Sequence, residues 1–170
     1  MKTKRVVVVA YDPRWKTEFE KIKSPIAEVL GNLAIAIEHV GSTSVPGLWA
    51  KPIIDLDVVI PNRDCLEQVI SKLKSIGYRH EGNLGIPGRE AFCYDNKPEY
   101  MQHHLYVCCQ DSEELHRHLA FRNYLRSHPD AAEEYGKVKR EAAQKFPEDI
   151  DSYIDFKSNA IQKIYQICNV

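Results

Sequence analysis

The sequence has no long hydrophobic run and no excess of charge of either sign. The apolar run Val6–Ala10 is too short for the core of a signal peptide, and Tyr11, Asp12 and Pro13 follow it directly. No run approaches the length that spans a bilayer, so we expect no membrane partner. The formal net charge of −1 gives no electrostatic reason to expect a nucleic-acid partner.

A cysteine pattern typical of a metal site or of a disulfide framework is also absent. The five cysteines, an odd number, are Cys65, Cys93, Cys108, Cys109 and Cys168. We therefore expect reduced thiols in a cytoplasmic protein. Because 44% of the 170 residues are hydrophobic and 28% are charged, we expect residues 1–170 to form one domain with its own core.

The most informative stretch runs from residue 34 to residue 60. It begins with the apolar run Ala34–Val40, which predicts a buried strand. This run breaks at Gly41 and Ser42, where small residues let backbone amides approach a ligand closely. A second apolar strand is expected over Ile53–Ile60.

Asp55 and Asp57 interrupt the second strand and share one of its faces, because successive strand residues point to opposite sides. Two adjacent carboxylates repel each other. The pair is explained either by a solvated strand end or by a divalent cation, and hard oxygen ligands suit Mg²⁺. A Gly-Ser turn upstream of Asp-x-Asp favours the second interpretation, a phosphate cradle that faces a metal.

A Gly-Ser turn before Asp-x-Asp resembles the signature of the nucleotidyltransferase fold. More narrowly, the stretch Glu38–Leu48 followed by Lys51–Asp55 is similar to the GrpB family. That family consists of small bacterial proteins of the nucleotidyltransferase-like superfamily, and some members are fused to dephospho-CoA kinase.

The resemblance extends over nearly the whole chain. It includes Tyr11–Trp15, His103–Leu105 and His118–Pro129. The sequence departs from the family at Tyr106, where members carry a histidine, and at Asn123, where members usually carry aspartate.

The resemblance implies a chemistry and a set of ligands. In nucleotidyl transfer, a hydroxyl attacks the α-phosphate, pyrophosphate leaves, and metal ions stabilise the charge. Asp55 and Asp57 would then bind Mg²⁺ or Mn²⁺. A nucleoside triphosphate or another phosphorylated small molecule would be bound by Gly41, Ser42, Thr43, Lys51 and Arg122.

Arg122 from this set, and His104 on a later strand, each allow two interpretations. Arg122 shares the apolar stripe of its helix, so it either snorkels at the edge of the core or reaches an anion. His104 is either a hydrogen-bonded strand residue or a catalytic group. Full nucleotidyltransferases add a third carboxylate, for which Glu90 and Asp95 are the acidic candidates unless His104 fills that space.

We expect an α+β fold, with a nucleotidyltransferase-like mixed β-sheet, helices packed on one face and a C-terminal helical segment. Helical periodicity follows Pro13, with a kink or break near Ser24 because of Pro25. Three C-terminal helices are expected, with starting residues at Ser112, at Asp130, and at Asp149 or Asp151.

Three functions remain open at this point. The first is a metal-dependent nucleotidyltransferase that acts on an unknown acceptor. The second is a nucleotide- or phosphometabolite-binding module without catalysis, with a link to CoA metabolism. The third is a metal-dependent phosphohydrolase that uses the same carboxylates and releases phosphate instead of pyrophosphate.

Overall fold

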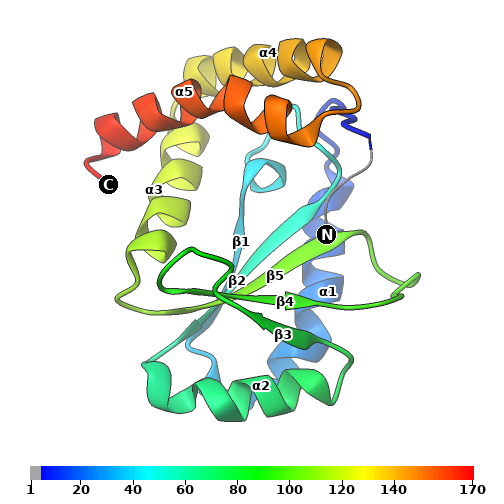
Figure 1. The fold of residues 1–170 in the computed structure, drawn as a ribbon, viewed down its shortest axis with the longest axis vertical. Coiled ribbons are helices and arrows are strands. Elements are labelled where there is room, and N and C mark those ends of the chain that lie inside the picture. Colours follow the sequence, from blue (N-terminus) through cyan, green and yellow to red (C-terminus); the bar gives the residue numbers. More distant parts are fainter. Residues whose placement is uncertain (1–4) are drawn as a thin grey trace.

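The computed structural model describes residues 5–170, and its centre is a five-stranded mixed sheet in the order β1-β2-β5-β4-β3 (Figure 1). The strands are β1 (Ala36–Val40), β2 (Ile54–Ile60), β3 (Arg79–Gly82), β4 (Arg89–Cys93) and β5 (His103–Cys109). Strands β2 and β5 run parallel, and the other neighbouring pairs are antiparallel. The two strands that carry Asp55 and His104 are therefore direct neighbours.

One face of the sheet holds the main core. Helices α1 (Arg14–Leu30) and α2 (Leu66–Lys74) pack against it. From β2, the side chains of Ile54, Leu56 and Val58 point into this core and are fully buried. Because strand side chains alternate, Asp55 and Asp57 must point to the opposite face.

The C-terminal helices lie on that opposite face and across one end of the sheet (Figure 1). They are α3 (Glu113–Ser127), α4 (Pro129–Lys145) and α5 (Ile150–Cys168). A second, smaller apolar cluster joins them to the segment that follows Gly41, through Val45 and Leu48. Its other buried members are Phe121, Leu125, Ala132, Tyr135 and Ile164.

The predicted mixed sheet and C-terminal helical segment are confirmed, and so is Asp149 as the residue that caps α5. Of the predicted kink or break near Ser24, the break is wrong, because α1 continues through Pro25 to Leu30. The predicted cap at Asp130 is also wrong: α4 begins at Pro129, whose fixed φ suits the first helical position.

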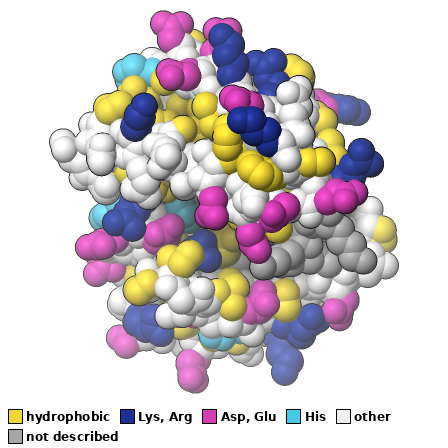
Figure 2. Space-filling view, turned by 45° about the horizontal axis from the view of Figure 1, so that its top comes forward, with side chains coloured by type: hydrophobic (Ala, Val, Ile, Leu, Met, Phe, Trp, Pro, Cys, Tyr) yellow, Lys and Arg dark blue, Asp and Glu magenta, His cyan; other side chains and the backbone are white. Residues whose placement is uncertain are grey.

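The surface around α4 and α5 carries mixed charge. On the face shown in Figure 2, basic and acidic side chains are interspersed with apolar ones and do not gather into a patch of one sign. No helix within residues 5–170 is both long and apolar enough to cross a membrane.

The central position of β5 predicts a large cost for truncating its buried side chains. Leu105, which is 1% exposed, lies in the main core, and Leu105→Ala should lower the free energy of unfolding by about 2–5 kcal/mol. Ile167→Ala, at a site that is 61% exposed, should change it by less than about 0.5 kcal/mol. Urea denaturation followed by circular dichroism measures both, and equal effects would contradict this description of the core.

Candidate active site

The turn after β1 brings backbone directly against Asp55. Gly41 has φ 73° and ψ −173°, a conformation that is almost exclusive to glycine. A Cβ atom at this position would overlap the Asp55 carboxylate. The glycine is therefore needed both for the turn and for the close approach.

Thr43 and His39 hold this turn in place from within the protein. The Thr43 hydroxyl donates to the Ile53 carbonyl over 3.3 Å, and the His39 Nε2 lies 2.9 Å from the Thr43 oxygen. The His39 ring also stacks on Phe19 of α1. Burial lowers the pKa of His39 to about 4, so the ring is neutral at pH 7. Because the Thr43 hydroxyl gives its proton to Ile53, it accepts the hydrogen bond that His39 donates from Nε2–H.

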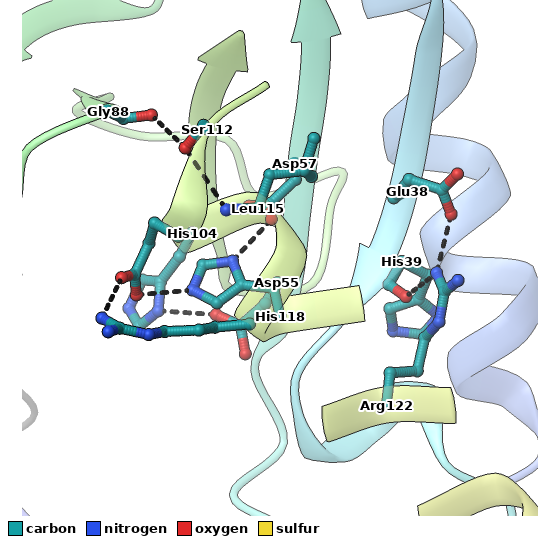
Figure 3. Close-up of polar contacts among 12 residues, drawn as sticks. Glu38, His39, Asp55, Asp57, Gly88, His104, Ser112, Leu115, His118 and Arg122 are labelled. Carbon is teal, nitrogen blue, oxygen red and sulfur yellow. Dashed lines mark hydrogen bonds and ion pairs between the residues drawn. The ribbon is translucent and has the colours of Figure 1, made fainter. Parts of the chain in front are cut away.

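Asp55 and Asp57 lie next to each other on the site face, and β5 supplies a neighbour for each. His104 is in register with Asp55, and Tyr106 with Asp57. The His104 Nδ1 lies 2.9 Å from Asp55 Oδ1 (Figure 3). The Asp55 side chain is 26% exposed, so it remains accessible to a ligand.

Asp57 is fully buried and is held by helix α3 (Figure 3). Its Oδ2 is 2.5 Å from His118 Nδ1, and His118 Nε2 is 3.1 Å from Glu114 Oε1. The other oxygen, Asp57 Oδ1, is buried and has no hydrogen-bond partner within the described chain. A buried carboxylate oxygen without a partner is costly, and a bound cation would remove that cost.

The two aspartates differ in their electrostatic surroundings. Burial raises the pKa of Asp57, and the hydrogen bond from His118 offsets this in part. For Asp55, burial acts in the same direction, but the His104 hydrogen bond and nearby positive charges lower its pKa. Burial would lower the pKa of His118, but its bonds to Asp57 and Glu114 raise it to about 9. At neutral pH, His118 is therefore a cation between two carboxylates.

Most of the predicted site residues surround one hollow of about 190 Å³ next to Asp55. From the predicted set, Ser42, Thr43, Lys51, Asp55 and His104 line it. Two further lysines, Lys139 of α4 and Lys157 of α5, complete its wall. Gly41 and Asp57 are not part of the lining, although Gly41 lies directly against Asp55.

Arg122 lies apart from this hollow. Its Nη1 donates to Glu38 Oε2 over 2.7 Å and to the His39 carbonyl over 3.1 Å (Figure 3). Of the two interpretations of this residue, the structure thus gives the anion contact, but the anion is a carboxylate of the protein itself. Arg122 ties α3 to β1.

Neither acidic candidate for a third carboxylate is near the aspartates. Glu90 is in register with Val107 on the core face of the sheet, and it binds Arg63 and His80. Asp95 forms an exposed ion pair with Arg79. Within residues 5–170, no group of three or more His, Cys, Asp or Glu side chains is placed to hold a metal ion.

Four residues of the site were not predicted. Glu114 and His118 are four residues apart on α3, a spacing that predicts contact on a helix, but nothing local connects them to Asp57. Lys139 falls on the apolar stripe of α4 with Ala132, Tyr135, Gly136 and Ala142. A lysine on an otherwise apolar stripe is a feature of the sequence from which Lys139 could have been predicted as a functional residue. Lys157 gives no comparable signal in its helix.

The chain is similar to a known protein family and to individual relatives. The model of the GrpB protein family matches residues 5–167, so the chain belongs to the GrpB family. UPF0157 protein YqkA of Bacillus subtilis is 35% identical over 94% of this chain, which spans 46% of YqkA. Glutamate-rich protein GrpB of Alkalihalophilus pseudofirmus is 32% identical over 94% of this chain and 93% of its own length.

The chain is also similar to part of a longer protein and to a solved structure. A dephospho-CoA kinase of Mycolicibacterium paratuberculosis is 24% identical over 95% of this chain, which spans 45% of that protein. The crystal structure of GrpB from Enterococcus faecalis matches with a TM-score of 0.77 and 34% identity over 94% of this chain and 99% of that one.

The Cid1 poly(U) polymerase, solved as an H336N mutant bound to MgATP, matches with a TM-score of 0.53 and 12% identity. That match covers 77% of this chain and 45% of Cid1. Together with the mixed sheet, it confirms the predicted nucleotidyltransferase-like fold.

Gly41→Ala should disrupt the site more than an alanine substitution at another glycine with positive φ. The substitution costs about 1–3 kcal/mol of backbone strain and pushes the Asp55 carboxylate out of place. Gly47 also has positive φ, but a Cβ atom there meets nothing within 4 Å, so Gly47→Ala is the matched control. Both variants should unfold at lower temperature in a thermal-shift assay, and Gly41→Ala should show the larger decrease, because it also displaces the Asp55 carboxylate.

The raised pKa of His118 predicts a loss of stability in alkaline solution. Its folded-state pKa of about 9 lies above the ordinary 6.5, so the stabilisation is complete below pH 6.5 and is lost as the pH rises to about 9. The free energy of unfolding, measured with a chelator present, should fall by on the order of 3 kcal/mol over this range. His118→Asn should remove this dependence. The exposed His116 on the same helix provides the control, because His116→Asn should leave it unchanged.

Proposed function

We propose that this protein transfers a nucleotidyl group from a nucleoside triphosphate to an acceptor in a reaction that depends on Mg²⁺ or Mn²⁺. The observation that carries the proposal is the placement of Asp55 and Asp57 on one strand face, with the Gly41 turn packed against Asp55. The fold shared with Cid1, which has been solved with MgATP, is consistent with it.

The donor set fits a cation that also binds substrate. Mg²⁺ in nucleotide enzymes is commonly held by one or two carboxylates together with substrate phosphates and waters. Asp55 and Asp57 would supply the carboxylates, and the unpartnered Asp57 Oδ1 is an oxygen that a cation would satisfy. When bound, the metal stabilises negative charge on the attacking and leaving oxygens.

His104 is the proposed general base. Its Nδ1 faces Asp55, so an Nδ1–H donated to that carboxylate leaves the lone pair on Nε2 available for a proton. His104 also lines a second hollow of about 340 Å³, together with Arg79, Glu81 and Tyr94. An acceptor hydroxyl in that hollow would give its proton to His104 as its oxygen bonds to the α-phosphorus, and the bond to pyrophosphate would break.

A nucleotide- or phosphometabolite-binding module is the second candidate, and one observation favours it. In the part of the chain that the structure describes, no group of three or more His, Cys, Asp or Glu side chains is placed to hold a metal ion. Glu38, which is in register with Asp57, is bound by Arg122, and His118 already occupies Asp57 Oδ2. Such a site would bind a ligand without turning it over. The similarity to part of a dephospho-CoA kinase makes CoA precursors reasonable ligands to include in a screen.

The test combines ligand binding with product analysis. Nucleoside triphosphates and CoA precursors, each with Mg²⁺ or Mn²⁺, are screened by thermal shift, and positive ligands are assayed for pyrophosphate release. Replacing Asp55 and Asp57 with asparagine should abolish the metal-dependent shift and slow pyrophosphate release by at least about a hundredfold.

Asp64→Asn is the matched control, because it removes an exposed carboxylate that lines neither of the two hollows. It should behave as wild type, and circular dichroism verifies that each variant folds. Unchanged pyrophosphate release in the double variant would refute the proposal. A shift without turnover would support the binding module, and release of phosphate in place of pyrophosphate would indicate a hydrolase.

A further inference from the structure

Three lysine side chains from separate segments face the hollow beside Asp55. Lys51 precedes β2, Lys139 lies on α4 and Lys157 lies on α5. Across residues 5–170, none of the three forms an ion pair with a carboxylate. Asp55 is the acidic residue in the lining, and His104 already binds it. The lining of the hollow therefore holds more basic side chains than acidic ones.

Lys139 is difficult to explain by packing alone. It is 2% exposed, and its Nζ donates to the Trp49 carbonyl over 2.9 Å. That bond satisfies one of the three ammonium protons. Burial, reinforced by repulsion from Lys157 and Lys51, lowers the pKa of Lys139 well below its usual range. A methionine of similar length would avoid this penalty, so stability alone does not explain a lysine at this position.

Lys51 and Lys157 are held at the same hollow by one aromatic ring. Their ammonium groups lie 5.4 Å and 4.8 Å from the ring centroid of Tyr153, within the range of cation–π attraction. Tyr153 is fully buried. The two charges are thus positioned before any ligand arrives, which lowers the entropy that binding would cost.

The charge and the size of the hollow together define its ligand. A volume of about 190 Å³ is below the roughly 300–1,000 Å³ of pockets that enclose a drug-sized molecule. A compact anion fits, and a whole nucleotide does not. Several positive groups around a small volume match the several negative charges of linked phosphates.

We propose that this hollow binds the polyphosphate portion of a nucleotide, and that Lys139 and Lys157 of the C-terminal helices are its main phosphate-binding groups. The inference rests on the proposed function, because it assigns part of the ligand at that site. The nucleoside lies outside the hollow. Inorganic tripolyphosphate, which lacks a nucleoside, therefore binds at the same place.

Calorimetric titration of the full chain with tripolyphosphate tests this directly. Lys139→Met and Lys157→Met should each weaken binding by about tenfold to a hundredfold. The exposed lysines of the same helices give matched controls, Lys137→Met on α4 and Lys163→Met on α5, and these should bind as wild type. Wild-type protein that does not bind tripolyphosphate, or hollow variants that bind it as tightly as wild type, would overturn the inference.

Thermal unfolding without ligand separates binding from a structural role. If Lys139 is present for its ligand, Lys139→Met should unfold at the same or a higher temperature than wild type, since a buried ammonium has been removed. A lower unfolding temperature together with wild-type affinity would show a structural lysine. Tripolyphosphate binding without pyrophosphate release from any nucleotide would leave this inference standing and refute the transferase. Pyrophosphate release without tripolyphosphate binding would refute this inference and leave the proposed transferase standing.

Discussion

Alternate side chains of β2 face opposite sides of the sheet, and the two sides differ in polarity: one packs into the apolar core and the other carries carboxylates. Toward α1 and α2, the strand buries Ile54, Leu56 and Val58 completely. Toward α3, it carries Asp55 and Asp57, of which Asp57 is equally buried. The apolar face fixes the register of β2, and this in turn fixes the position of both carboxylates. The rest of the site is arranged around that fixed pair.

The groups that stabilise the carboxylates come from other elements. His104 lies on β5, the parallel neighbour of β2, His118 lies on α3, and the Gly41 turn packs against Asp55. Each contact couples the position of an aspartate to the packing of a distant segment. The small apolar cluster between Val45, Leu48 and the C-terminal helices therefore supports the site even though none of its members lines the hollow.

The parts of the fold with a local pattern could be predicted from the sequence. Alternation placed Asp55 and Asp57 on one face, and the Gly41-Ser42 break marked the turn. A break at Pro25 does not occur: α1 continues through it, with Ile22 and Ile26 on either side fully buried in the main core.

The walls of the site could not be predicted in the same way. Arg122 was grouped with the ligand-binding residues, but it binds Glu38, 84 positions away along the chain. His118, Lys139 and Lys157 reach the site through tertiary packing of three helices. The residues next to them in the sequence do not indicate where those helices pack. The metal, the nucleotide and the roles of individual residues remain predictions.

The chain order of these elements separates the scaffold from the binding groups. Residues 14–109 contain all five strands and the two helices of the main core, whereas His118, Lys139 and Lys157 follow later. During synthesis on a ribosome, the sheet and the aspartate pair, with His104 and Lys51, therefore emerge before His118, Lys139 and Lys157. An incomplete chain would carry Asp57 without its His118 partner and only one of the three lysines of the hollow, so the proposed phosphate site would be complete only once the last helices had docked.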